Sequence, residues 1–184
     1  MAKELLISGF MIARNLVTQG YPFLEAITAA LPVCDEFLVS EGFSSNETWA
    51  ALQWLQQKYP DKLKLFRDEW RGGQWRGQVI AVMQNVLLER CRGAYALSVQ
   101  ANEVLHEAAY AELRALPALY PGVEIFNLPF YHLLGSHILW AVDFRKRLFK
   151  NKPYIRSLGD GYDVYYDRAR LWTQPRKFIR RYKK

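Results

Sequence analysis

The sequence predicts an α/β fold in three layers, with a mostly parallel central sheet covered by helices on both faces and mixed strands added in the C-terminal half. Two observations support this prediction. Short apolar segments alternate with longer segments of helical period as far as Leu116, and only strand-like segments follow. Strands that alternate with helices of this length form a parallel sheet, whose two faces must both be buried.

In the first part of the chain, each predicted strand is a short apolar segment, and the four strands lie at Glu4–Ala13, Glu36–Glu41, Leu63–Arg67 and Tyr95–Val99. The predicted helices span Phe23–Leu31, 47 to 59, 75 to 91 and Ala108–Leu116. Pro22 favours a helix start, because the first turn of a helix does not need its N–H. Asn46 is expected to cap the second helix.

After Pro121 the pattern changes. Four strand-like pieces are separated by Gly, Ser, Asn and Pro, and they lie at Val123–His132, Ile138–Ala141, Arg147–Lys150 and Tyr162–Tyr166. No helical period of comparable length separates them. We therefore expect these pieces to join the same sheet as mixed or antiparallel strands.

The length and composition indicate one folded domain. The chain has 184 residues, a hydrophobic content of 51% and a charged content of 23%, which exclude a disordered chain. We predict a single domain over residues 1–172 and a basic tail over residues 173–184. Six Lys and Arg residues with no acid among them lie in the last nine positions, so most of the net charge of +7 belongs to the tail.

The apolar pattern and the N-terminus favour a cytoplasmic protein. No apolar run approaches the roughly 20 residues that span a bilayer, and the N-terminus does not resemble a secretory signal. Cys34 and Cys91 lie at predicted element ends without metal-type spacing, so we interpret both as packing thiols.

Ligands of open α/β sheets bind outside the carboxyl ends of the strands, at a switch in strand order. This rule selects four loops, each dense in polar groups: Arg14-Asn15, Glu41–Asn46, Arg71–Gly77 and Gln100–Glu103. The binding site is therefore expected where these four loops meet.

Three motifs in these loops resemble those of a known family. The first strand ends in Ile12-Ala13-Arg14-Asn15, and the second leads from Asp35-Glu36 to Glu41-Gly42-Phe43-Ser44-Ser45-Asn46. The fourth strand runs into Gln100-Ala101-Asn102-Glu103. Their order and spacing resemble the nucleotide-sugar-dependent glycosyltransferases of family 2, which have the Rossmann-like GT-A fold. The resemblance covers roughly residues 5–107. Within the family, the chain resembles an uncharacterised subgroup that has Gln in the first position of the Asp-x-Asp-Glu motif.

The resemblance implies a nucleotide-sugar site. Four residues would hold the nucleoside: Ala13, Arg14, Asn15 and Glu41. The ordinary alternatives are that Asn15 is a turn residue and that Glu41 is a solvated acid at a strand end. Arg71 and Arg76 flank a Gly-rich loop before a helix, where free N–H groups and the helix dipole suit phosphate. The positions next to the diphosphate would be Gln100, Ala101 and Asn102.

In the family, two carboxylates of this motif bind a divalent cation, Mn²⁺ or Mg²⁺, that bridges the phosphates. Here Gln100 and Asn102 offer amide oxygens without negative charge, so a weaker site is expected. Three outcomes stay open. Asn102 and Glu103, together with His132, hold a metal; or Arg71, Arg76 or a tail residue replaces it; or the protein transfers nothing.

An inverting transfer needs a carboxylate that takes the acceptor's proton. Asp160 is the first candidate by position, with Asp143 and Asp163 as the others. Gly159-Asp160-Gly161 is also an ordinary turn sequence. Several aromatic residues are expected in or near the cleft, where they would stack on a sugar: Trp70, Trp75, Tyr131 and Trp140.

The implied activity is transfer of a sugar from a nucleotide donor to a glycan or lipid-linked acceptor. The basic tail mixes cations with aromatic residues, which suits an anionic membrane at the inner face; a solvated end is the alternative. A catalytically degenerate binding or partner module is the second hypothesis. A nucleic-acid-binding α/β domain is the third, and the absence of a basic stripe on the body disfavours it.

Overall fold

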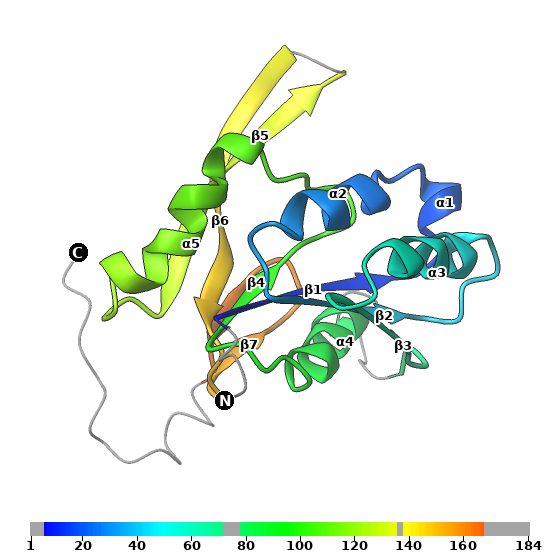
Figure 1. Cartoon of the computed structure of the whole chain (residues 1–184), viewed down its shortest axis with the longest axis horizontal. Coiled ribbons are helices and arrows are strands. Elements are labelled where there is room, and N and C mark those ends of the chain that lie inside the picture. The colour runs from blue at the N-terminus through cyan, green and yellow to red at the C-terminus, as the bar shows by residue number, and fades with distance from the viewer. Residues whose placement is uncertain (1–5, 72–77, 136–137, 168–184) are drawn as a thin grey trace.

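The computed structural model describes residues 6–71, 78–135 and 138–167 and confirms the α/β fold. Eight strands are present in this part of the chain (Figure 1): β1 Ile7–Ala13, β2 Glu36–Glu41, β3 Leu63–Arg67, β4 Tyr95–Ser98, β5 Ile125–Leu134, β6 Ile138–Lys150, β7 Ile155–Ser157 and β8 Val164–Tyr166. The helices are α1 Leu16–Gln19, α2 Phe23–Ala30, α3 Thr48–Lys58, α4 Gln78–Leu88, the 3₁₀ turn η1 Glu107–Ala109, and α5 Tyr110–Leu119. None of the described helices is long and apolar enough to cross a bilayer.

Six strands form one mixed sheet in the order β3-β2-β1-β4-β6-β5. The first four are parallel, and β6 runs antiparallel to both β4 and β5. The strand order reverses at β1, which lies between β2 and β4. Loops at the carboxyl ends of β1, β2 and β4 therefore meet at the switch in strand order.

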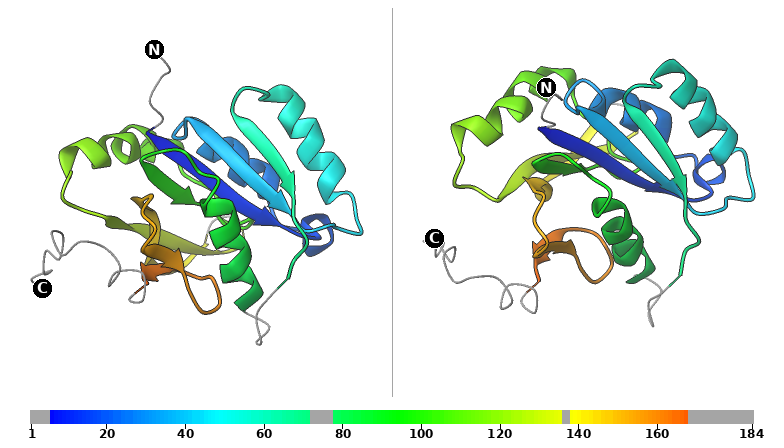
Figure 2. Two further views of the ribbon diagram at one scale, coloured as in Figure 1. Left: turned by 90° about the horizontal axis from the view of Figure 1, so that it is seen from below. Right: turned by 60° about the horizontal axis from the view of Figure 1, so that its bottom comes forward.

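Two hydrophobic clusters cover the two faces of the sheet (Figure 2). On one face, α2, α3 and α5 cover the sheet through residues such as Ile27, Leu52 and Leu113. On the other face, α4 and the β7–β8 pair pack over Phe10 and Phe149. Successive side chains of a strand point to opposite faces of the sheet, so each strand contributes apolar residues to both clusters.

Both cysteines are free and buried, as their positions predict. Burial raises the pKa of Cys34 and of Cys91 to about 12. Thiols with such a pKa are unreactive at neutral pH, so both residues serve packing.

Several elements differ from expectation, and the short helix α1 is one that the sequence does not predict. The pieces predicted at Ile138–Ala141 and Arg147–Lys150 form one continuous strand, β6. The prediction misses the segment between them because it carries the charged residues Asp143, Arg145 and Lys146. Strand β7 is not predicted at all. Helix α3 begins at Thr48, whose backbone N–H donates to Asn46 Oδ1 at 3.1 Å, so the Asn46 side chain still satisfies the start of that helix.

Only the last three residues of β6 pair with β4, whereas β5 accompanies β6 along nearly its whole length. The two strands therefore leave the body as a two-stranded ribbon, which projects beyond the helices in Figure 1. We call its outer part, residues 129–134 and 138–144, the arm.

A buried carboxylate ties three parallel strands together. Glu36 on β2 is 2% exposed and accepts hydrogen bonds from Ser8 Oγ at 2.7 Å and from the Arg92 backbone N–H at 2.9 Å. Lys64 on β3 forms an ion pair with the same carboxylate, as does the Arg92 guanidinium. Burial opposes ionisation, but the hydrogen bonds from Lys64, Arg92 and Ser8 outweigh it and lower the pKa of Glu36 to about 2.

Replacing Glu36→Gln is expected to lower the free energy of unfolding at pH 7 by about 1.5–3 kcal/mol, since it weakens hydrogen bonds to a buried charged group. The pKa of Glu36 in the folded protein lies below the ordinary value of 4.5, so the stabilisation is present above pH 4.5 and is lost as the pH falls toward 2. Urea unfolding at pH 7 and pH 3 measures both values. The difference between wild type and variant should be smaller at pH 3, and the exposed Glu112→Gln should stay within about 0.5 kcal/mol of wild type at pH 7.

Candidate functional site

An open pocket of about 400 Å³ lies at the carboxyl ends of β1 and β2. Its lining comes from the loops after three strands: Arg14, Gly42, Phe43, Glu69 and Trp70. The first three of these belong to loops that the switch-point rule selects, and Trp70 is one of the aromatic residues expected near the cleft. The structure thus brings two of the predicted loops together around one hollow.

Side-chain hydrogen bonds hold these two loops against each other. The Asn15 backbone N–H donates to Ser44 Oγ at 2.8 Å, and Asn15 Oδ1 accepts from the Ser45 backbone N–H at 2.9 Å. Asn15 has a φ of 54° and Phe43 a φ of 52°, both left-handed. Asn tolerates this conformation and Phe seldom adopts it, so the turn at Phe43 is held by its surroundings.

Those surroundings include Glu41, which is fully buried at the end of β2. Its carboxylate accepts hydrogen bonds from the backbone N–H of Phe43 at 3.2 Å and from that of Ser44. Arg67 Nε on β3 donates to it at 2.9 Å, and the Arg67 guanidinium also lies 4.4 Å from the Phe43 ring centroid. Glu41 therefore sets the shape of the loop that carries Phe43.

Trp70 forms the floor of the pocket beside Gly42. A Cβ at Gly42 would come within 2.3 Å of Trp70 Nε1, so only glycine lets the indole approach this closely. Trp70 Nε1 is buried and has no hydrogen-bond partner among the described residues. The Arg14 guanidinium lies 5.6 Å from the indole centroid. The pocket thus offers an aromatic ring and a cation.

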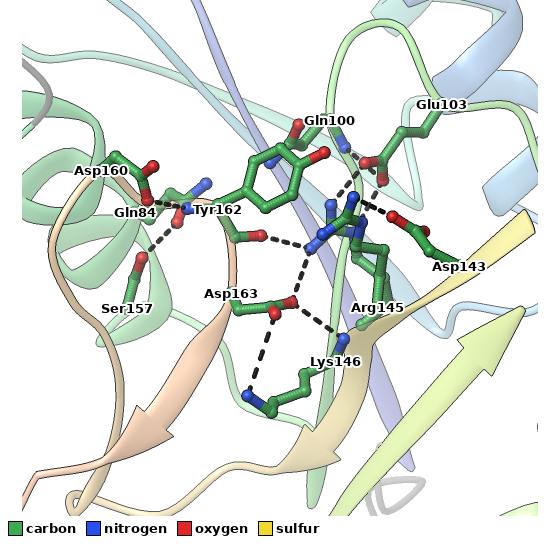
Figure 3. A network of polar contacts seen from close by, with 11 residues as sticks. Gln84, Gln100, Glu103, Asp143, Arg145, Lys146, Ser157, Asp160, Tyr162 and Asp163 are labelled. Carbon is green, nitrogen blue, oxygen red and sulfur yellow. Dashed lines mark hydrogen bonds and ion pairs between the residues drawn. The ribbon is translucent and has the colours of Figure 1, made fainter. Parts of the chain in front are cut away.

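The turn after β4 is closed by a hydrogen bond from the Glu103 backbone N–H to the Gln100 carbonyl at 3.0 Å. Asn102 is exposed, and Ala101 packs partly against the core. The Glu103 carboxylate points toward β6, where Arg147 binds it through Nε at 2.8 Å and through Nη2 (Figure 3). Both side chains are largely buried, at 6% exposure for Arg147 and 12% for Glu103.

The metal ligands expected at Asn102, Glu103 and His132 are not assembled. Arg147 binds both oxygens of Glu103, and His132 Nε2 lies 3.3 Å from Asp143 Oδ2 on the ribbon. Over residues 6–71, 78–135 and 138–167 there is no group of three or more His, Cys, Asp or Glu that could hold a metal ion. A carboxylate engaged by a guanidinium cannot also serve a cation without losing that partner, so these residues do not fit a divalent metal.

The three candidate bases occupy different settings. Asp160 is exposed between two left-handed glycines, and its Oδ1 accepts from the Tyr162 backbone N–H at 3.1 Å, which is the expected turn. Asp163 accepts from the Lys146 backbone N–H at 3.0 Å and lies 3.5 Å from Arg147 Nη1. Asp143 forms an ion pair with Arg145. Figure 3 shows Asp143 beside Arg145 and Asp163 beside Lys146, with Asp160 farther off.

The remaining predicted residues divide into three groups. Arg71 is 78% exposed and pairs with Glu69 at the pocket's edge. Tyr131 and Trp140 lie on the arm and do not line the pocket, so their expected place in the cleft is wrong. Arg76, Trp75 and the basic tail lie outside the described residues.

Sequence reasoning gave no role in the site to Arg147 or Arg67. Arg147 precedes the buried Leu148 and Phe149 of β6. A charged residue next to such an apolar segment indicates a buried ion pair, and this was the sequence signal that could have identified it. No local pattern indicated the contact between Arg67 and Glu41, because those residues lie on different strands.

Solved structures of other proteins share this mixed six-stranded fold. The chain is similar to TarS of S. aureus in complex with UDP, with a TM-score of 0.54 and 16% identity over 73% of this chain and 38% of that one. It is also similar to the mannosyltransferase PcManGT from Pyrobaculum calidifontis in complex with GDP-Man and Mn²⁺. That comparison has a TM-score of 0.50 and 17% identity over 67% of this chain and 35% of that one.

These likenesses place the chain among GT-A-like structures, and at such identities they concern the fold alone. The chain spans well under half the length of both proteins. No family model and no curated protein sequence matches it.

Replacing Arg147→Ala is expected to lower the free energy of unfolding by about 3–5 kcal/mol, because the Glu103 carboxylate would stay buried without a partner. Replacing both residues, as Glu103→Leu with Arg147→Met, should recover much of this loss. Urea unfolding of wild type, both single variants and the double variant gives the coupling energy. A double variant no more stable than Arg147→Ala would contradict the assignment, and the exposed Arg71→Gln should leave the unfolding midpoint unchanged.

Proposed function

We propose that the protein binds a nucleotide sugar at the carboxyl ends of β1, β2 and β4 and transfers the sugar to a glycan or lipid-linked acceptor, with inversion. The pocket formed by Arg14, Phe43 and Trp70 is the observation that carries the proposal, because it lies where α/β sheets of this order bind ligands. The likeness to TarS, solved with UDP and with UDP-GlcNAc, supports it.

The pocket suits a nucleoside. A flat base gains stacking energy on an aromatic ring, and both Phe43 and Trp70 are available in the lining. The backbone at Ala13 to Asn15 would pack against the sugar of the nucleoside, with Glu41 acting through the loop that it shapes.

The diphosphate would then lie toward the turn after β4. Arg14 supplies positive charge at the pocket, and Arg71 lies at its edge; Arg76 follows on the same loop of the sequence. Gln100 and Asn102 would contribute amide hydrogen bonds rather than metal coordination. We therefore propose that arginine side chains, and not a divalent cation, neutralise the leaving diphosphate.

A carboxylate must accept the acceptor's proton as the bond to the sugar forms. Asp160 is the exposed candidate, and its loop packs on helix α4, where a Cβ at Gly161 would come within 2.4 Å of Ile80 Cγ2. Asp143 and Asp163 are the alternatives, and both are engaged by cations of β6. The basic tail would bring the enzyme to an anionic membrane at the cytoplasmic face.

A second candidate function is nucleotide binding without transfer. The amides at Gln100 and Asn102, together with the engagement of Glu103 by Arg147, favour this alternative because the usual acidic cluster is missing. A glycosyl-transfer or donor-hydrolysis assay with each sugar nucleotide that binds separates the two. Binding of a sugar nucleotide without any turnover would support the second candidate function, nucleotide binding without transfer.

Isothermal titration of the full chain with UDP, GDP, ADP and CDP should show micromolar binding of at least one of them. Trp70→Leu and Arg14→Gln should each weaken this binding at least tenfold, because they remove stacking and charge at the pocket. Trp54→Leu on α3 is the matched control and should bind normally. If none of the four nucleotides binds the folded protein, the proposal fails.

Addition of Mn²⁺ is expected to change nucleotide affinity in the wild type by less than about threefold, since the described residues do not form a metal site. The double change Gln100→Asp with Asn102→Asp should introduce a dependence on Mn²⁺, because it restores two carboxylates at the turn after β4. Titration with and without Mn²⁺ measures both effects. Unchanged Mn²⁺ dependence in this variant would place the diphosphate elsewhere.

A further inference from the structure

The arm exposes large apolar side chains along both of its strands. On its inner part, Tyr131 is 59% exposed, its cross-strand partner Val142 is 48% exposed, and Phe144 is 65% exposed. Trp140, at the irregularity in the strand pairing, is 76% exposed. Such a cluster on a projecting element marks a surface for a partner or a membrane.

The outermost residues expose both faces of the ribbon. Leu133 pairs with Leu139, and Leu134 pairs with Ile138. Successive residues of a strand point to opposite faces, so one pair lies on each face. All four side chains are between 52% and 62% exposed. We call these four residues the tip.

No Asp, Glu, Lys or Arg occurs between Leu133 and Val142. The four tip positions and Trp140 together cover two residues of β5 and three of β6, or roughly 7–10 Å of ribbon at the usual rise. This length matches the roughly 5–10 Å to which apolar side chains enter a membrane interface. It is far short of the strand length that spans a bilayer.

We propose that the tip of the arm inserts into the interfacial layer of a lipid membrane, with Trp140 at the headgroup level. Lipid surrounds a ribbon on both faces, whereas a protein surface covers one face and leaves the other in water. The two exposed apolar faces of the tip therefore favour lipid. Trp and Tyr are the residues that belong at the boundary of the hydrocarbon layer, and Trp140 and Tyr131 lie just behind the tip.

The charge of the chain complements an anionic lipid surface. Residues 168–184 contain eight Lys and Arg residues and no acid. Each basic residue near such a surface adds about 1 kcal/mol of attraction at ordinary salt. One shallow apolar contact gives only reversible binding, and a second, electrostatic contact makes it stable. The arm supplies the first contact, and the tail proposed above supplies the second.

The test is flotation of the full chain with a large excess of phosphatidylcholine vesicles, which drives even the reversible contact of the arm, in 0.5 M salt, where the Debye length is below about 5 Å and the tail is screened. Wild type should float with the vesicles. Leu133→Ser with Leu139→Ser changes one face, and Leu134→Ser with Ile138→Ser changes the other. Each double variant should reduce partitioning at least tenfold, because each removes apolar surface from lipid.

Leu119→Ser is the matched control, since Leu119 on α5 is 64% exposed outside the arm, and it should float like wild type. A second measurement uses brominated lipids, which should quench the tryptophan fluorescence of wild type more than that of Trp140→Phe. Near-ultraviolet circular dichroism and nucleotide titration of every variant show that the body is intact, so this proposal and the proposed function can fail separately.

Failure of wild type to float would overturn the proposal. Loss of flotation in only one double variant would indicate a one-sided contact and would also overturn it. Sedimentation velocity provides the third outcome. A concentration-dependent dimer that either double variant abolishes, without vesicle binding by wild type, would make the arm an interface between two copies.

Discussion

The buried ion pair between Glu103 and Arg147 joins the parallel and antiparallel halves of the molecule at the candidate site. Glu103 follows β4, and Arg147 lies on β6, the antiparallel neighbour of β4. The planar guanidinium fits both carboxylate oxygens, and its Nη1 also holds the Tyr162 carbonyl at 2.6 Å. Two charges remain in such a setting only as a pair. Arg147 on β6 therefore holds the turn after β4 and the loop at Tyr162 together.

This pair also decides the electrostatics of the site. A GT-A-like sheet places the turn after β4 next to the proposed diphosphate, and a free acid there would attract a divalent cation. Here the acid is already neutralised by a side chain of the same protein. The proposed chemistry accordingly depends on arginines at the loops after β1 and β3, and the exposed Asn102 adds an amide where a carboxylate would add charge.

Glu41 has a comparable role at the nucleoside end. It is buried, it accepts two backbone N–H groups of the following loop, and Arg67 balances its charge. The loop is thereby held with Phe43 in a left-handed conformation beside Trp70. A pocket of this kind is formed before any ligand arrives, which limits the ordering that binding requires.

Much of the fold could be predicted because it depends on short-range patterns. The alternation of apolar strands with helices of regular period identified β1 to β4 and the helices between them, and the switch-point rule identified the loops that carry Arg14, Gly42 and Phe43. The prediction divided β6 into two pieces, because Asp143 and Arg145 interrupt the run of apolar residues. Those residues lie on a ribbon that leaves the body, so no core requires them to be apolar.

The sequence by itself determined the order of the elements, the α/β class and the edge of the sheet at which a ligand would bind, because each of these follows from periodicity and chain direction. Tertiary structure alone decided which side chain Glu103 meets, where Trp70 lies, and that Tyr131 and Trp140 project on an arm instead of lining the pocket. These outcomes depend on contacts between residues far apart in the chain. Packing and burial in the folded chain determine which residues meet, and a local sequence pattern does not contain that information.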